Sequence, residues 1–226
     1  FLKKNINKNY VFYVIGRNFS NINKLINSKD NKKKIIKIKF DFNHNLKKLN
    51  LYKFPKFDYI LVAAGIAKDN LISNFDEKIF DEIIKVNLTQ PAKLLGLLYK
   101  NDKINNKASI VLISSISGYK SSYKLHYSYS ISKAGLIAMT KSLAAELSQK
   151  LIRVNAVAPG MVSTPLIDKL KADDYFINID KKKYLLGKRY AKPSEVSDVV
   201  NFLLSSKSSF ITGETIVIDG GFTLTK

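Results

Sequence analysis

The sequence predicts a doubly wound α/β fold with a mostly parallel sheet. Six short runs rich in β-branched residues recur along the chain, and each is followed by a polar or helical stretch. The runs are continuously apolar rather than alternating, which suits strands covered on both faces, and the intervals suit crossover helices. At 226 residues the chain can bury one substantial core, so we expect a single domain over residues 1–226.

The predicted strands and helices alternate. The strands cover residues 10–15, 35–40, 59–62, 109–113, 153–158 and 215–218. Between the third and the fourth, Ser73 to Asp76 resembles a capping box, and apolar residues continue at helical spacing to Leu98. Pro91 should kink this long helix or remove one backbone hydrogen bond. Further apolar stripes predict a helix over residues 131–147 and another that starts at Pro193.

The beginning of the sequence lacks a phosphate-binding turn. Phe1 to Asn5 has the pattern of a helix tail that runs into the first strand, and the first 64 residues contain one glycine, Gly16. A glycine-rich turn that places a dinucleotide pyrophosphate at a helix N-terminus therefore cannot lie in this part. We expect one strand, its glycine turn and most of a helix to lie upstream, so that the domain is N-terminally incomplete.

The chain is strongly basic, with a formal charge of +20. Only three of its 38 basic residues are arginines, which leaves 35 lysines, and lysine is the weaker choice for bidentate recognition of phosphates and bases. Lysine is abundant alongside asparagine and isoleucine, so a compositional bias toward solvated lysines explains the charge better than a nucleic-acid site does. We expect no nucleic-acid partner, although the basic surface could favour acidic partners.

Other classes are excluded by what the sequence lacks. No apolar run approaches the roughly 20 residues that span a bilayer, and the first five residues do not resemble a signal peptide. We therefore expect a cytoplasmic protein without membrane association. Because the chain has no cysteine, it has no disulfide, no cysteine-ligated metal and no cysteine nucleophile, and no metal site is expected.

A tyrosine four residues before a lysine makes chemical sense on a helix, because the ammonium can then stabilise the anion of the phenol. With 12 tyrosines and 35 lysines, chance alone predicts about 1.9 such pairs, so the spacing needs further support. Four pairs occur: Tyr52 with Lys56, Tyr99 with Lys103, Tyr129 with Lys133, and Tyr184 with Lys188.

Sequence context selects one pair. Only Tyr129 opens an amphipathic helix and follows a strand that ends in the serine-rich segment 114–118. This arrangement resembles the active site of the short-chain dehydrogenase/reductase family, whose pattern selects Ser115 over its neighbouring serines. The resemblance implies a Rossmann-like dinucleotide-binding and catalytic domain that reduces a carbonyl with a nicotinamide cofactor.

Further segments carry the same resemblance. Residues 85–88 resemble the segment with the family's fourth catalytic residue, here Asn87, and residues 211–221 resemble its last strand and flanking turns. Residues 156–164 resemble the loop that closes over the nicotinamide, which assigns cofactor contacts to Pro159, Gly160, Val162 and Thr164. The family's Asn-Asn-Ala-Gly reads Val-Ala-Ala-Gly here, and the small residues Ala63, Ala64 and Gly65 would let the backbone approach the adenosine. The stretch 41–58 is short for the family and implies an abbreviated helix.

The roles of the catalytic residues follow from the chemistry of carbonyl reduction, in which negative charge develops on oxygen. Tyr129 would donate the proton, with its pKa moved from near 10 to about 7 by Lys133 and the nicotinamide charge. Ser115 would hydrogen-bond the substrate oxygen. By resemblance, Tyr129 and Lys133 also contact the cofactor, and Asn87 holds a water that links Lys133 to solvent. Taken alone, Ser115 could instead cap a turn and Asn87 could satisfy backbone groups.

His126 could suggest a hydrolase. No Gly-x-Ser-x-Gly elbow surrounds the serine, however, so we interpret His126 as a loop residue.

Two residues after strands predict the cofactor. Arg17 follows the first strand, where enzymes that prefer NAD usually carry an acid, and a guanidinium can pair with a 2′-phosphate. This favours NADPH, the alternative being a surface arginine. Asp41, with Phe42 beside it, resembles the family's adenine contact, the alternative being that it simply ends the second strand.

The substrate prediction also comes from resemblance. Residues 65–71, 185–189 and 193–195 are similar to segments of 3-oxoacyl-acyl-carrier-protein reductases, which implies a 3-oxoacyl thioester and an acyl carrier protein as partner. The variable stretch from Leu166 to Tyr184 would form a substrate lid, and the helices near Asp76 and Tyr129 would assemble a homotetramer or homodimer. The alternatives are reduction or oxidation of a sugar or nucleotide-sugar and, in another class, a non-catalytic basic binding protein on the same scaffold.

Overall fold

The computed structural model describes residues 1–6, 8–25, 34–120, 126–164 and 180–225. The strands are β1 (Phe12–Gly16), β2 (Ile35–Lys39), β3 (Phe57–Val62), β4 (Ile104–Ile113), β5 (Arg153–Pro159) and β6 (Thr215–Ile218). The helices are α1 (Leu2–Asn5), α2 (Ser20–Leu25), α4 (Glu77–Ile84), α5 (Gln90–Lys100), α6 (Tyr127–Leu147) and α9 (Pro193–Leu204). All six predicted strands are confirmed, and β4 begins five residues earlier than predicted. No helix in these ranges is both long enough and apolar enough to cross a membrane.

The strands are parallel, as predicted, and their hydrogen bonds form two groups. One group has the order β3-β4-β5-β6, and β1 pairs with β2 in the other. In the described chain no ladder joins β1 to β3, so the single sheet that the sequence predicts is divided here. Aromatic side chains still connect the two groups, because the ring centroids of Tyr13 and Phe57 lie 5.5 Å apart and those of Tyr10 and Tyr59 lie 5.7 Å apart.

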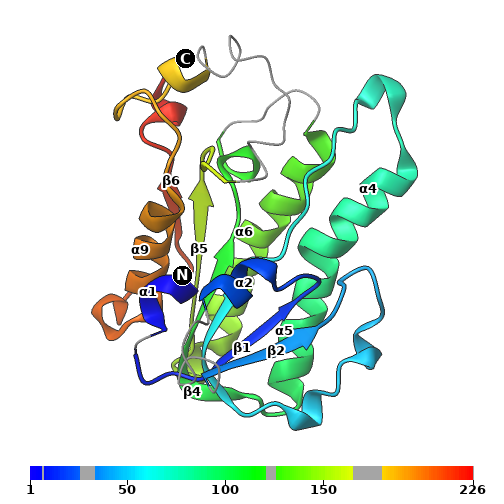
Figure 1. The fold of residues 1–226 in the computed structure, drawn as a ribbon, viewed down its shortest axis with the longest axis vertical. Coiled ribbons are helices and arrows are strands. Elements are labelled where there is room, and N and C mark those ends of the chain that lie inside the picture. Colours follow the sequence, from blue (N-terminus) through cyan, green and yellow to red (C-terminus); the bar gives the residue numbers. More distant parts are fainter. Residues whose placement is uncertain (7, 26–33, 121–125, 165–179, 226) are drawn as a thin grey trace.

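Helices cover both faces of the larger sheet, which explains its continuously apolar strands (Figure 1). On one face, side chains of α5 and α6 bury the alternate residues Ile110, Leu112, Val154 and Ala156. On the other face, Val200, Leu203 and Leu204 of α9 pack against Val111 and Val157. Two neighbouring residues of one strand therefore belong to different cores. This arrangement fixes the carboxyl ends of β4 and β5 next to the N-terminal part of α6.

The predicted start of the long helix is corrected by three residues. Asp76, rather than Ser73, is the N-cap of α4, and its carboxylate accepts a hydrogen bond from the backbone N–H of Ile79 at 3.1 Å. Ser73 lies in the 3₁₀ turn η3 (Ile72–Asn74). Both residue types favour N-caps, and the side chain of Asn70 selects the later one by accepting from the N–H of Asp76 at 3.0 Å.

Pro91 does not break the helix. Between α4 and α5 the chain forms a π-helical turn, η4 (Lys85–Thr89), in which the N–H of Gln90 donates to the carbonyl of Lys85. This wider turn places Pro91 in the first turn of α5, where a missing N–H costs little. The helix therefore continues through a π-bulge, a feature that often marks functional positions.

The connection from β2 to β3 contains no α-helix, as the short stretch 41–58 predicts. It forms two 3₁₀ turns, η1 (Leu46–Lys48) and η2 (Leu51–Lys53). Leu46, Leu49 and Phe54 are buried and seal this edge of the core. The connection between two parallel strands usually contains an α-helix. Because this connection has none, α5 has no neighbouring helix on this side in the described part of the chain.

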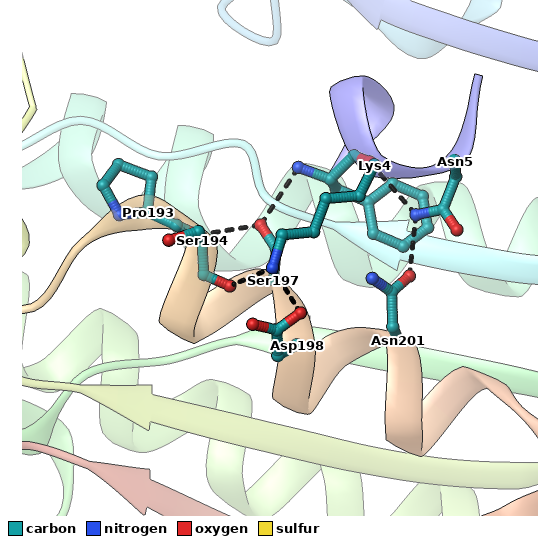
Figure 2. A network of polar contacts seen from close by, with 8 residues as sticks. Lys4, Asn5, Pro193, Ser194, Ser197, Asp198 and Asn201 are labelled. Atoms are coloured by element: carbon teal, nitrogen blue, oxygen red, sulfur yellow. Dashed lines mark hydrogen bonds and ion pairs between the residues drawn. The ribbon is translucent and has the colours of Figure 1, made fainter. Parts of the chain in front are cut away.

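The first residues are helical, as predicted, and α1 packs against α9 through polar contacts (Figure 2). The amino group of Phe1 donates to the hydroxyl of Ser197 at 3.0 Å, and the amide of Asn5 donates to the side-chain oxygen of Asn201 at 2.7 Å. Lys4 forms an ion pair with Asp198. The contacts hold the beginning of the described chain on the face that α9 covers.

Candidate active site

The serine-rich segment after β4 forms a 3₁₀ turn, η5 (Ile116–Gly118), with Ser115 as its N-cap. Ser115 accepts a hydrogen bond from the N–H of Ser117 at 3.2 Å. The hydroxyl of Ser114 is buried and donates to the carbonyl of Lys133 at 2.8 Å, which ties the strand end to α6. Ser114 is thus committed to the fold, and Ser115 is the serine whose hydroxyl meets Tyr129.

Tyr129 and Lys133 lie one turn apart on α6. The phenol of Tyr129 shares a side-chain hydrogen bond with Ser115, and the Nζ of Lys133 lies 5.5 Å from the centroid of the Tyr129 ring. Nζ also donates to the carbonyl of Ile113, the last residue of β4, at 2.8 Å. The structure therefore brings together the serine, the tyrosine and the lysine that the sequence selected.

The other three tyrosine–lysine pairs do not form such a site. Tyr52 is exposed, and the ring of Tyr99 faces Lys150 rather than Lys103. Tyr184 is buried, and its hydroxyl accepts a hydrogen bond from the N–H of Met161 at 3.0 Å. Of the four pairs, the Tyr129 pair is the one whose phenol contacts Ser115.

Burial controls the charges of the two helical residues. It lowers the pKa of Lys133 to about 8, and it raises the pKa of Tyr129 above its ordinary value, with the Ser115 hydrogen bond opposing the rise. The expectation of a Tyr129 pKa near 7 therefore does not hold for the protein alone. The phenol stays protonated at neutral pH, which suits a proton donor.

Asn87 lies in the π-helical turn, and its side chain is fully buried. Its oxygen accepts from the N–H of Ile66 at 2.8 Å, and its amide donates to the carbonyl of Ile66 and the hydroxyl of Ser132. The side chain thus fixes the loop after β3 against α6. Pro91, four residues later, has no N–H to donate to the backbone carbonyl of Asn87.

Gly118 lies against the backbone of α6, with no room for a side chain. A Cβ at this residue would lie 2.4 Å from the backbone nitrogen of Ala134 and 2.5 Å from the backbone carbon of Lys133. The absence of a side chain therefore lets η5, with Ser115, lie directly on the helix that carries Lys133. Because backbone atoms are in the way, no side-chain rotation can relieve the overlap.

We expect Gly118→Ala to destabilise the protein by about 1–3 kcal/mol and to lower activity by displacing Ser115. Gly96→Ala is the matched control, because a methyl group on this helical residue would meet no atom within 4 Å beyond the adjacent residues and backbone of its own helix. Here a gain of about 0.5–1 kcal/mol is expected. Urea unfolding of both variants measures the difference. Equal stabilities would contradict the close contact.

Apart from Tyr129 and Lys133, which lie on α6, the predicted cofactor-binding residues lie at the carboxyl ends of strands, where α/β proteins bind ligands. Arg17 follows β1, Asp41 and Phe42 follow β2, Ala63 to Gly65 follow β3, and Pro159 to Thr164 end and follow β5. Arg17 is exposed, and its guanidinium lies 4.0 Å from the carboxylate of Asp41. The loop after β3 reaches the catalytic residues, because a Cβ on Gly65 would lie 3.4 Å from the Nζ of Lys133.

The residues fit the nicotinamide half of a dinucleotide. Lys133 is buried, and its ammonium has three N–H donors, one of which bonds to the carbonyl of Ile113. A diol such as that of a ribose could accept hydrogen bonds from the others. In the loop after β5, a Cβ on Gly160 would lie 3.2 Å from both Asp219 and Tyr184, so the backbone of this loop packs closely.

The structure adds residues that sequence reasoning missed. Tyr184, which we expected only as the end of a lid, holds the loop 160–161 through its hydroxyl. Ser132 joins Asn87 to the carbonyl of Tyr129. No pattern marks either residue, because each acts through a contact distant in sequence. His126 is half-buried beside Tyr129, with ring centroids 5.7 Å apart. Most of the predicted lid, residues 166–179, lies outside the described ranges.

Comparison with known proteins gives a consistent family. The sequence model of the family described as enoyl-(acyl carrier protein) reductase matches residues 44–223. The 3-oxoacyl-[acyl-carrier-protein] reductase of Thermotoga maritima is 38% identical over 76% of this chain and 68% of its own length. That of Buchnera aphidicola is 36% identical over 80% of this chain and 77% of its own length.

Solved structures share the fold. A 4-hydroxyisoleucine dehydrogenase complexed with NADH has a TM-score of 0.87 at 27% identity, and the match covers 100% of this chain and 93% of the other. A short-chain dehydrogenase family protein from Francisella tularensis has a TM-score of 0.84 at 29% identity, with 97% and 90% covered. Fold and site together define an α/β oxidoreductase that uses a nicotinamide cofactor. The chain belongs to the short-chain dehydrogenase/reductase family.

Proposed function

We propose that this protein reduces the ketone of a 3-oxoacyl thioester to an alcohol with NADPH. The observation that carries the proposal is the contact between the hydroxyls of Ser115 and Tyr129, with the ammonium of Lys133 behind the phenol. Two adjacent hydroxyls can donate to one oxygen atom, which is what a ketone being reduced requires. The similarity to 3-oxoacyl-[acyl-carrier-protein] reductases supports the same substrate.

In this mechanism Ser115 donates a hydrogen bond to the substrate oxygen and fixes its position. Tyr129 donates a second hydrogen bond and then transfers its proton to that oxygen. Lys133 lies close enough to stabilise the phenolate that remains, since an opposite charge favours the ionised form. Asn87 bonds to Ile66 in the loop after β3 and to Ser132 on helix α6. It thereby fixes the loop against the helix that carries Tyr129 and Lys133.

The cofactor supplies the hydride when it is bound. We propose that Lys133 and Tyr129 hold its nicotinamide ribose, with Pro159, Gly160, Val162 and Thr164 beside the nicotinamide ring. The backbone of Ala63, Ala64 and Gly65 would lie along the adenosine, and Asp41 and Phe42 would contact the adenine. The proposal is supported by the position of the other residues at the carboxyl ends of parallel strands, whereas Lys133 and Tyr129 lie on α6.

Arg17 is proposed to select NADPH by pairing with its 2′-phosphate. The side chain is exposed at the end of β1, and its guanidinium lies 4.0 Å from the carboxylate of Asp41. We expect Arg17→Ala to weaken NADPH binding about tenfold and to leave NADH binding nearly unchanged. Titration of cofactor fluorescence measures both affinities, with Arg189→Ala, whose guanidinium is paired with Glu195, as the control. An equal loss for both cofactors would contradict the assignment.

A substrate panel tests the proposed reaction. NADPH oxidation is followed with a 3-oxoacyl thioester, the matching 2-enoyl thioester, and a sugar or nucleotide-sugar, each offered at the same concentration. The proposal predicts the highest kcat/KM for the 3-oxoacyl thioester, and higher still when an acyl carrier protein bears it, because an acidic carrier would be attracted to a basic protein. Preferential turnover of the enoyl compound or of the sugar would overturn the substrate assignment while leaving an oxidoreductase.

We also propose that the protein forms a homotetramer or homodimer. Phe75, Tyr127 and Ile131 are exposed near the starts of α4 and α6, and the ring of Tyr127 stacks on Phe80 at 5.8 Å. Exposed aromatic side chains that gather on one helix pair favour an interface. Sedimentation equilibrium gives the mass, and a species of 25.5 kDa at micromolar concentration would contradict the proposal.

A further inference from the structure

A groove runs along α5 on the side where the β2–β3 connection has no α-helix. It has a volume of about 610 Å³, and its lining comes from α5, the preceding π-helical turn and η1. Leu46 and Leu97 contribute apolar surface, and Gly96 removes any side chain from the middle. The groove is separate from Ser115, Tyr129 and Lys133, none of which lines it.

Four exposed lysines border the groove, namely Lys47, Lys85, Lys93 and Lys100. Within the part of the chain that the structure describes, none of them forms an ion pair with an acidic residue. Lys93 and Lys100 lie two turns apart on α5, and Lys47 borders the groove from η1. The groove therefore combines an apolar floor with unpaired positive charge on its borders.

The dimensions suit a helix. Residues 90–100 extend about 15 Å along the α5 axis, at 1.5 Å per residue. The place beside α5 that a crossover helix would occupy is bordered by the 3₁₀ turn η1 instead. Gly96 is exposed, so a second helix could approach α5 closely at this residue.

We propose that this groove binds an acidic amphipathic helix of a partner protein. Apolar side chains of that helix would cover Leu46, Leu97 and Gly96, and its carboxylates would pair with the bordering lysines. A second copy of this chain fits poorly, because a twofold contact through the groove would place lysines beside lysines. Nucleic acid also fits poorly, because none of the lining residues is aromatic and bases would have nothing to stack on.

The probe is a fluorescein-labelled helical peptide with a leucine stripe flanked by glutamates, and a peptide with lysines in place of the glutamates is its control. Fluorescence anisotropy with the full chain should show binding of the acidic peptide only, weakened by about 0.3 M salt. The double variant Lys93→Glu/Lys100→Glu should bind at least about tenfold more weakly. The matched double variant Lys141→Glu/Lys207→Glu carries the same change in net charge on other elements and should bind within about twofold of the unchanged protein.

A steric variant tests the apolar floor independently of charge. Gly96→Leu places a side chain in the groove at a helical position with free space, so the fold should be as stable as before or more stable. It should reduce peptide affinity at least about tenfold, since the floor is then filled. Unchanged affinity in Gly96→Leu, or equal losses in the two double variants, would overturn the proposal. So would tighter binding of a labelled duplex RNA that the groove variants abolish, because the groove would then be a nucleic-acid site.

Discussion

Replacing Tyr129 with phenylalanine is expected to lower kcat/KM for reduction of a 3-oxoacyl thioester by about 10²–10⁴-fold. The change removes only the phenolic hydroxyl, which shares a hydrogen bond with Ser115 and is the proposed proton donor. The ring that packs beside His126 and Lys133 remains, so the fold and the affinity for NADPH should be retained. Steady-state kinetics measure kcat/KM, and cofactor titration of the same protein measures the affinity for NADPH.

Tyr127→Phe is the matched control for this prediction. Tyr127 lies on the same helix, two residues earlier, and its ring stacks on Phe80 rather than facing the site. Loss of its hydroxyl should change kcat/KM by less than about twofold. If Tyr129→Phe kept the activity of the unchanged protein, the proton would have to come from another group, and the assigned role of Tyr129 would be wrong.

Lys133→Met is expected to abolish most of the activity, by about 10²-fold or more, and at the same time to stabilise the protein near pH 7. Burial of the ammonium lowers its pKa from 10.5 to about 8, which corresponds to a cost of about 3 kcal/mol when the lysine must be charged. Methionine keeps most of the apolar volume. Loss of the hydrogen bond to the carbonyl of Ile113 offsets part of the gain, about 1 kcal/mol.

The sign of the pH dependence identifies the buried lysine. Between about pH 8 and 10.5, Lys133 is neutral in the folded protein and charged in the unfolded chain, so the unfolded state binds more protons. The unchanged protein therefore gains stability relative to Lys133→Met as the pH rises through this window. The advantage that the variant has at pH 7 becomes smaller toward pH 10.5. Lys141→Met, an exposed lysine on the same helix, should show no such trend. Urea unfolding across this pH range measures the difference in unfolding free energy between the unchanged protein and Lys133→Met. A difference that stays constant with pH would show that the ammonium is not desolvated.

The strands and the main helices could be predicted from sequence because their apolar patterns report burial directly. The continuous apolar runs of β4 and β5 arise because Val111 and Ile110, adjacent residues, face different helix layers. The cluster of Ser115, Tyr129 and Lys133 could also be predicted. Ser115 lies in one short segment at the end of β4, Tyr129 and Lys133 lie one turn apart in another, and the end of the strand faces the start of the helix. These features depend on local spacing.

The remaining features depend on contacts between distant segments. Asn70 decides that Asp76 caps α4, and the π-helical turn accommodates Pro91. The high pKa of Tyr129 results from burial by surrounding elements, which a spacing rule cannot measure. Asn87 illustrates the same limit, because its bonds to Ile66 and Ser132 exist only in the folded chain.

The measurement that tests the site most directly is a double-mutant cycle on Ser115→Ala and Tyr129→Phe, with kcat/KM for a 3-oxoacyl thioester as the readout. Both hydroxyls are proposed to act on the same oxygen, and residues that work as a unit give strongly non-additive losses. The double variant should therefore be little worse than the poorer single variant, with all three proteins folded and able to bind NADPH. Losses that multiply fully, or single variants that keep full activity, would contradict a shared oxygen at this site.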